Sequence, residues 1–468
     1  MLSRPSRVLV PAAGRSWLVA IALAVLVAGC YGGEGYSDYA TGPGAPGGDG
    51  TVSNYGPGAF SQAAANLSQD EIARFRIGDR FFTQPWSSAP GEAPESDGLG
   101  PTYLATSCAA CHPADGRSSA PASADGEGSP ILRFVDATGA GSDLDDYHHQ
   151  LQTDAVDGVP PEGVLTITWE EVEVTYPDGS PISLRRPVIG AEGAFGELGG
   201  ALASGVRVGP SLIGLGLLEA IPQGDVMDGA DPSDDDGDGI SGRVPMVLPL
   251  SGGDEVLGRF GLKGNVASVA DQTAIAYLLD MGITSPLLPD ENCPVVQVDC
   301  ANAPAGGSPE ISEQRFADVV FYTQSLAVPG RPFAADESIV AGQRIFEDIG
   351  CAGCHVPKWV TGDHEVSAFV GQTIYPYTDL LLHDMGEGLS DGRADGSASA
   401  TEWQTPALWG LGLTRTVNAD AGFLHDGRAR NVEEAVLWHG GEAGAATRAF
   451  TELSESDREL VLNFLKSL

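Results

Sequence analysis

Two short segments of the sequence repeat the same arrangement of two cysteines and a histidine. They are Cys108–Cys111–His112 and Cys351–Cys354–His355. One helical turn can present both thiols of such a segment to the vinyl groups of a porphyrin, and the adjacent imidazole then ligates the iron. A single copy also occurs in redox dithiols, and a zinc site would need further paired ligands nearby, which the sequence lacks. Two copies that both end in His therefore predict two covalently attached haems c.

The surroundings of the second motif are typical of a small cytochrome c. Residues 337–346 predict a helix with Ile339, Gly342 and Phe346 on one face, directly before the motif. Residues 457–468 predict the C-terminal helix that crosses it.

The N-terminal thirty residues predict export. Arg4, Arg7 and Arg15 precede a short apolar run that ends in Ala28-Gly29-Cys30. This end resembles a lipobox, so residues 1–30 are a predicted lipoprotein signal peptide with Cys30 as the lipidated residue. An ordinary signal peptide with a chance cysteine is the alternative. We expect the chain on the periplasmic side of the outer membrane; a soluble periplasmic form and an inner-membrane anchor are the alternatives.

Two further cysteines, Cys293 and Cys300, are separated by a short loop. An oxidising compartment favours a disulfide between them, and two free thiols are the alternative.

The remaining pattern predicts a mainly α fold with two cytochrome c-like haem domains, long loops and a small inserted β-hairpin or sheet in the N-terminal part. A glycine-rich stretch at 31–63 reads as a flexible tether. Residues 64–330 are the predicted N-terminal haem domain with insertions, and 331–468 the C-terminal cytochrome c domain. A capping-box pattern at Ser68 predicts the start of the first helix. The β-prone alternation over residues 164–189 predicts the hairpin, and residues 195–204 are predicted to be helical.

Several longer stretches match a known pattern. Together with Asp234–Arg243 they are Gly258–Lys263, Asp280–Thr284, Tyr377–Gly386, Trp403–Gly410 and Leu424–Ala429. They resemble the di-haem oxidoreductase family, also called thiol oxidoreductase-like proteins, which is related to the bacterial di-haem cytochrome c peroxidases. Gln404 departs from the family, which usually has Arg there. The resemblance implies an oxidoreductase, whereas nothing in the sequence supports a thiol substrate.

The resemblance also implies a distal ligand for the second haem. In the bacterial peroxidases a His-Asp-Gly segment is followed by a helix and an axial Met. Here His425 opens the matching segment, and His439 stands where the Met would be. His439 is therefore the predicted ligand, and a packed or exposed His is the alternative. His383 and Met385 are further candidates for an axial ligand of either iron, whereas His425 is expected to pack or to form a hydrogen bond with a propionate.

The first haem is expected to have His112 on one side and an open or water-filled position on the other, as peroxide chemistry requires. His148 and His149 are expected to lie in an exposed loop. Gln152, or a Glu near Glu162, is a guess for the distal acid–base group.

An acidic turn resembles the start of an EF-hand loop. Asp234, Asp236 and Asp238 alternate before Gly239, but the closing Glu is missing because Pro245 stands at the twelfth position. A solvated acidic loop is the first interpretation, and a bound calcium ion, as in related peroxidases, is the alternative.

The net charge of −39 argues against nucleic acid as a partner. It favours solubility, or docking of a basic redox partner in the periplasm. Three functions remain open: a di-haem oxidoreductase that reduces peroxide, a non-catalytic electron carrier with both haems six-coordinate, and an accessory lipoprotein for metal uptake.

Overall fold

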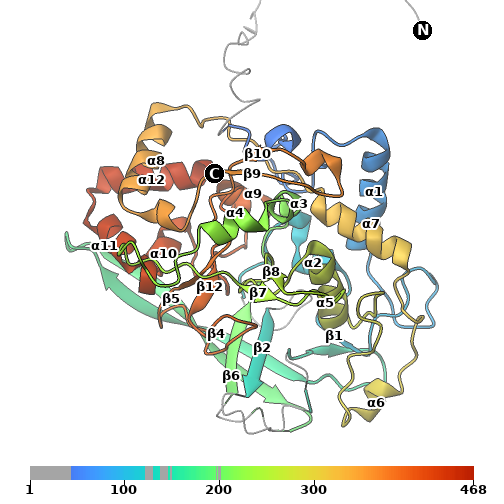
Figure 1. The fold of residues 1–468 in the computed structure, drawn as a ribbon. Helices are drawn as coiled ribbons and strands as arrows, with labels where there is room; N and C mark the ends of the chain where they lie inside the picture. The colour runs from blue at the N-terminus through green and yellow to red at the C-terminus, as the bar shows by residue number, and fades with distance from the viewer. Residues whose placement is uncertain (1–43, 122–129, 137–145, 148–149, 197, 199–201) are drawn as a thin grey trace, which may run out of the picture.

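The computed structural model describes residues 44–121, 130–136, 146–147, 150–196, 198 and 202–468, and Figure 1 shows their arrangement. The structure is 31% helical and 17% strand, with several small sheets, so the predicted mainly α fold is wrong. Within the described residues, the strands form six two-stranded antiparallel sheets. Several of these strands are two residues long or pair with distant segments, and neither kind leaves a local sequence pattern.

Two pairs of helices cross closely, one pair beside each cysteine motif. Helix α1 (Gln69–Thr83) crosses α7 (Glu313–Gln324), and α8 (Glu337–Asp348) crosses α12 (Glu455–Ser467). A Cβ added at Gly78 would lie 2.1 Å from the carbonyl oxygen of Asp318. A Cβ added at Gly342 would lie 2.1 Å from the carbonyl oxygen of Leu460. Only glycine permits these contacts, and the predicted crossing of α8 by the C-terminal helix is confirmed.

The ends of these helices follow their capping residues. The Ser68 hydroxyl accepts a hydrogen bond from the backbone N–H of Glu71, and the Glu71 carboxylate accepts one from the backbone N–H of Ser68. The Ser454 hydroxyl caps α12 in the same way by accepting from the N–H of Asp457. Each cap satisfies a donor that the first turn leaves unpaired.

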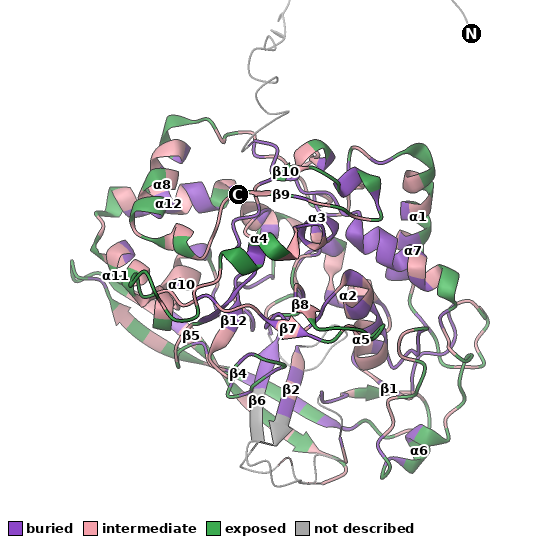
Figure 2. Ribbon diagram, in the orientation of Figure 1, coloured by how far each residue is buried: buried purple, intermediate pink, exposed green. Residues whose placement is uncertain are grey.

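The longest strands form the predicted hairpin, β4 (Gly163–Thr175) with β5 (Pro181–Gly193). Its start is buried on alternate residues and its far end is mostly exposed, as Figure 2 shows. Strands β2 (Ile131–Asp136) and β6 (Leu202–Arg207) form a second ribbon. The helix predicted over residues 195–204 is wrong for its last three residues, because these belong to β6.

The ribbon β2–β6 has two different faces. Leu132, Phe134 and Val206 pack with Leu165 and Ile167 of the hairpin into a small core. Alternate residues of the ribbon therefore point the other way, toward the centre of the molecule.

The main core begins before the predicted domain boundary. Ala59 and Phe60 are fully buried in it, so the flexible tether predicted for residues 31–63 is wrong for the described residues 44–63. This core also includes Val366, Phe369 and Ile374 from beyond residue 330. A second core surrounds the α8–α12 crossing. The division into two haem domains stays a prediction.

The remaining elements are one further long helix, α5, and many short elements. They are η1 (Gly48–Gly50), β1 (Thr102–Tyr103), α2 (Cys108–Cys111), η2 (Pro113–Asp115), β3 (Asp154–Ala155), α3 (Leu215–Glu219), α4 (Gln223–Asp228), β7 (Met246–Val247), β8 (Val256–Leu257), α5 (Val269–Met281), α6 (Val298–Ala301), η4 (Cys351–Gly353), β9 (Trp359–Val360), η5 (Ser367–Phe369), β10 (Thr373–Ile374), β11 (Leu382–Asp384), β12 (Glu402–Gln404), η6 (Leu411–Leu413), α9 (Thr414–Val417), α10 (Val432–Leu437), η7 (Gly441–Ala443) and α11 (Gly444–Glu452). Cys293 and Cys300 are joined by a disulfide, with their Cα atoms 5.7 Å apart. Among the described residues, no helix combines the length and apolar character needed to cross a membrane.

Candidate functional site

A single large cavity reaches both cysteine motifs. It has a volume of about 760 Å³, and Cys108, His112, Cys351, Cys354 and His355 all line it. The rest of its wall is mostly aliphatic and aromatic. The fourth thiol, Cys111, is buried in α2. The fold therefore brings together two motifs that are more than two hundred residues apart in the sequence.

Each motif histidine is held by a backbone carbonyl. Nδ1 of His112 lies 2.9 Å from the carbonyl oxygen of Pro210, and Nδ1 of His355 lies 3.0 Å from that of Tyr377. Because a carbonyl can only accept, Nδ1 carries the proton in both rings and Nε2 is left as the metal ligand. A Cβ added at Gly209 would lie 2.8 Å from Cε1 of His112, so glycine is required beside this ring.

Burial keeps both motif histidines neutral. Desolvation lowers the pKa of His112, and it lowers the pKa of His355 to about 4. A neutral imidazole is the form that ligates a metal. The two rings are therefore prepared as ligands without any adjustment of their protonation.

His439 follows α10 and repeats this arrangement. Its Nδ1 donates to the carbonyl oxygen of Ala435 at 2.7 Å, and burial lowers its pKa. His439 lines the same cavity, and it is close enough to His355 to lower the pKa of that ring electrostatically. The structure thus brings the predicted distal ligand to the His355 end of the cavity.

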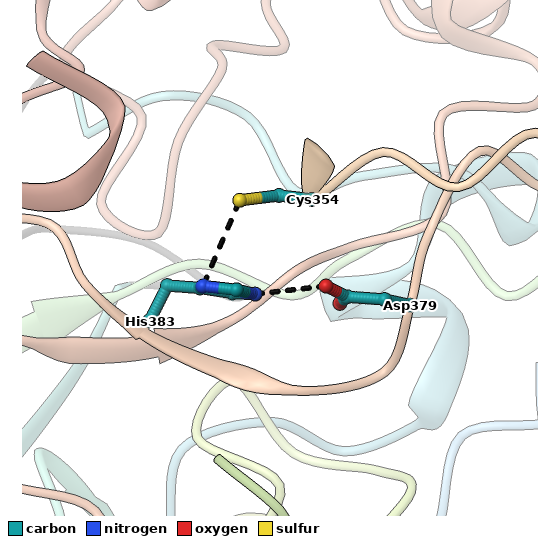
Figure 3. Close-up of side chains that lie close together, drawn as sticks. All are labelled: Cys354, Asp379 and His383. Carbon is teal, nitrogen blue, oxygen red and sulfur yellow. Dashed lines mark hydrogen bonds and ion pairs between the residues drawn. The ribbon is translucent and has the colours of Figure 1, made fainter. Parts of the chain in front are cut away.

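His383, the first rival candidate, has a carboxylate on each side, and Figure 3 shows the one from Asp379 together with the sulfur of Cys354. Its Nε2 is 2.8 Å from Oδ2 of Asp379, and its Nδ1 is 2.8 Å from Oε2 of Glu442. Burial alone would lower the pKa of His383, but the hydrogen bonds to Asp379, Cys354 and Glu442 outweigh it and raise the pKa to about 12. Both ring nitrogens therefore carry protons, and neither is available to iron.

The sulfur of Cys354 lies 3.6 Å from Nδ1 of His383. Ligand atoms of Cys354, Asp379 and His383 all lie within 4.8 Å of one another, a spacing that could hold a metal ion. Cys354 is also a motif thiol, so this group belongs to the surroundings of the second motif.

His425 stacks on Trp403, with the ring centroids 3.9 Å apart and the planes at 13°. Burial lowers the pKa of His425 to about 4. Its carbonyl oxygen accepts from the N–H of Val208, next to the glycine that supports His112. Met385 lines the cavity as well.

The His112 end of the cavity has a different wall. Burial raises the pKa of Cys108, and the nearby charge of Asp280 in helix α5 raises it further. The helix lines the cavity with Val269, Gln272, Ala276, Leu279 and other side chains, and none of its described residues at this wall is a His, Cys or Met.

The guessed acid–base groups do not line the cavity. The Glu162 carboxylate accepts from the backbone N–H of Gln152 and from the side chain of Gln297. The Gln152 amide donates to the carbonyl of Leu279. Both residues are buried in structural contacts. His148 and His149 lie outside the described residues.

The acidic turn differs from the predicted calcium set of Asp234, Asp236 and Asp238. The carboxylates that approach within 4.8 Å of one another are those of Asp231, Asp234 and Asp236. The Asp238 carboxylate instead accepts from the N–H of Ile240, because the loop turns there. Calcium binding stays a prediction.

The residues present fit two haems. Each motif offers two thiols and a neutral imidazole whose Nε2 is available, and the cavity wall is mostly aliphatic and aromatic, with several arginines among its polar residues. Cys108, Cys111 and His112 would hold one group, and Cys351, Cys354 and His355 the other.

A match to a known protein family agrees with this geometry. The family model described as "Di-haem oxidoreductase, putative peroxidase" matches residues 41–133 and 156–468. A structure of Kuenenia stuttgartiensis hydrazine synthase, pressurised with 20 bar xenon, aligns over 89% of this chain and 97% of that chain, with 14% identity and a TM-score of 0.34. No curated protein matches the chain. The family match spans nearly the whole described body, and the chain belongs to the di-haem oxidoreductase family.

Proposed function

We propose that the chain is an exported di-haem c-type cytochrome that reduces peroxide at the His112 end of the cavity and uses the His355 end for electron transfer. Haem would supply one-electron chemistry at both ends of the cavity, and Cys108, Cys111 and His112 would hold the group that reacts with peroxide. One observation carries the proposal: a second imidazole, His439, lines the His355 end, whereas α5 brings no comparable ligand to the His112 end.

Three hydrogen bonds to backbone carbonyls support the assignment of ligands. His112, His355 and His439 each donate from Nδ1, to Pro210, Tyr377 and Ala435 respectively. Each bond fixes the tautomer and the ring plane and leaves Nε2 available as a ligand. The thiols of the two motifs would form the covalent links, and the largely aliphatic and aromatic part of the wall would exclude water from the reacting centre.

Asp280 is the best-supported proton carrier at the His112 end. It lines the cavity, and the Gln150 amide donates to its Oδ1 at 2.8 Å. Burial raises the pKa of Asp280 to about 6. A carboxyl that titrates near neutral pH can hold a proton on Oδ and release it to a bound oxygen.

Spectra of the half-reduced protein, with and without hydrogen peroxide, test the proposal. We expect the His112 haem to show a high-spin or water-ligated population and to bind carbon monoxide when reduced. Both irons staying low-spin in every redox state, with no response to peroxide, would instead identify a non-catalytic electron-transfer or accessory lipoprotein.

A pair of variants tests the proton carrier. Asp280→Asn should lower peroxide turnover by about 10²-fold or more, with the haem spectra unchanged. Glu162→Gln is the matched control. Its carboxyl is also buried, and burial raises its pKa to about 7, but it does not line the cavity. Equal turnover in the two variants would remove Asp280 from the mechanism.

We also propose lipid anchoring through Cys30 at the periplasmic side of the outer membrane, where a redox partner protein delivers electrons. The disulfide Cys293–Cys300 supports an oxidising compartment. Cys30→Ala should move the protein from the membrane fraction to the soluble periplasm. Retention of that variant in the membrane would contradict the anchor.

A further inference from the structure

The ribbon β2–β6 carries two arginines into the cavity. Leu132 and Phe134 face the small core, so Arg133 between them faces the other way, and Arg207 follows Val206 for the same reason. Arg133 lies opposite Gly205, and Arg207 opposite Ile131, so the two side chains share one face of the ribbon. Both line the cavity.

The two arginines differ in their partners. Arg207 donates to Oδ2 of Asp395 at 2.7 Å and to Oδ2 of Asp391 at 2.9 Å. The Arg133 side chain makes no hydrogen bond or ion pair with any residue that the structure describes, and its Nε is buried without a partner. Burial lowers the pKa of Arg133 to about 10, so it still carries its charge at neutral pH.

The surrounding charges leave a positive excess. The cations are Arg133, Arg207, Lys263 and Arg393, and the carboxylates are Asp391, Asp395 and Asp280. Four positive charges thus meet three negative ones even when Asp280 is ionised. A buried charge without a counterion is costly, and a guanidinium fork matches a carboxylate in two parallel hydrogen bonds.

We propose that Arg133, supported by Arg207, binds a carboxylate inside the cavity, and that this carboxylate is a propionate of the haem at His112. The inference rests on the proposed function, because it requires haem at that motif. A free carboxylate entering the cavity offers the same chemistry from a second source. Gly205 makes the arrangement possible, since a Cβ there would lie 2.5 Å from Cβ of Asp391 and displace the counterion of Arg207.

The test is a redox titration of the complete, haem-loaded protein. Arg133→Gln removes the positive charge that stabilises the reduced haem beside an ionised propionate, so one of the two midpoint potentials should fall and the other stay. Arg186→Gln is the control with the same change in net charge, because Arg186 is exposed on the hairpin and pairs with Glu170. It should leave both potentials unchanged.

Added acetate separates the two sources. With a propionate in the site, the potential falls in Arg133→Gln without any added anion, and acetate has no effect on the wild type. With a free carboxylate, acetate shifts the wild-type potential and leaves Arg133→Gln unaffected. Either result supports the carboxylate site. Unchanged potentials with and without acetate, in a variant that retains two haems, would overturn it.

If Arg133→Gln does not load haem, a second variant, Arg133→Lys, keeps the positive charge but removes the forked guanidinium group. The propionate bending band in the resonance Raman spectrum should then move, and an unchanged band would overturn the inference. Absence of peroxide turnover in the wild type would contradict only the proposed function, because these measurements do not depend on turnover.

Discussion

At the scale of single residues, the site depends on which histidine nitrogens remain available to iron. In three histidines, His112, His355 and His439, Nδ1 donates a hydrogen bond to a backbone carbonyl and Nε2 remains available. In His383, by contrast, both ring nitrogens bond to carboxylates. The motif spacing predicts the first two from adjacent residues alone. The carbonyls of Pro210 and Tyr377, which orient the two motif rings, lie 98 and 22 residues away from them. Glu442 is likewise 59 residues from His383, although Asp379 is only four residues from it. Local pattern therefore cannot separate a ligand histidine from a salt-bridged one.

Replacing His439 by Met tests its role as a ligand. Thioether sulfur favours ferrous iron more than imidazole does, so His439→Met should keep the haem low-spin and raise the midpoint potential of the His355 haem. Redox titration and the weak sulfur-to-iron absorption band measure the change. His425→Met is the control, since that ring stacks on Trp403. An unchanged potential in His439→Met would return Met385 to consideration.

The ion pairs of His383 predict a dependence of stability on pH. The pKa of His383 is about 12 in the folded protein, above its ordinary 6.5. Its contribution is thus complete below pH 6.5 and is lost as the pH rises toward 12. Burial alone would raise the pKa of Glu442, but hydrogen bonds, first to His383, lower it to about 2 from its ordinary 4.5. That contribution is lost as the pH falls from 4.5 toward 2.

His383→Gln leaves two carboxylates without their cation, so the free energy of unfolding should fall by about 3–5 kcal/mol at neutral pH. In urea unfolding experiments, the free energy of unfolding of this variant should also decline less steeply above pH 6.5 than that of the wild type. His364→Gln is the matched control, because His364 has one carboxylate partner, Glu219, at 3.2 Å. An equal loss in both variants would mean that the two-carboxylate arrangement adds nothing.

At the scale of elements, local signals and long-range pairing account for the difference between prediction and structure. The cap at Ser68, the hairpin β4–β5 and the C-terminal helix all follow from residues within a few positions of one another. The ribbon β2–β6 joins two strands that are separated in the sequence by the whole hairpin. Strand β6 also contains a glycine, Gly205, opposite Arg133 of β2. Its pairing is decided by the small core on one face and the cavity on the other, which no single window of sequence contains.

The helix crossings predict a large effect of a very small side chain. In Gly342→Ala, the new Cβ would lie 2.1 Å from the Leu460 carbonyl oxygen and 2.9 Å from Cβ of Phe464. The helices α8 and α12 must move apart, and the free energy of unfolding should fall by about 1–3 kcal/mol or more. Gly224→Ala in α4 is the control, since no atom lies within 4 Å of its added Cβ.

That control variant should gain about 0.5–1 kcal/mol from helix propensity. Denaturant unfolding measures both changes. A neutral result for Gly342→Ala would show that the crossing tolerates separation, and that the glycine is not what holds α8 beside the second motif.

At the scale of the whole molecule, the charge is unevenly placed. The chain carries a net charge of −39, yet Arg117, Arg133, Arg207 and Arg259 all line the cavity. Net charge could be read from composition, whereas the gathering of arginines around the cavity could not, because they come from four separate segments. An acidic exterior around a cationic interior suits a protein that docks a basic partner outside and holds acidic groups within.

Docking of a basic partner predicts a steep dependence of electron delivery on salt. Opposite charges steer association, and they are screened beyond a Debye length of about 8 Å at physiological ionic strength. Reduction of the haem-loaded protein by a small basic cytochrome should therefore slow by roughly tenfold or more between low and physiological salt. Stopped-flow rates at several ionic strengths measure this, with a small acidic cytochrome of similar potential as the control.

That control should react slowly at low salt and faster as salt is added, because like charges repel. Rates with the basic donor that do not change with salt would show that the acidic surface serves solubility alone, and that the electron donor recognises an uncharged patch.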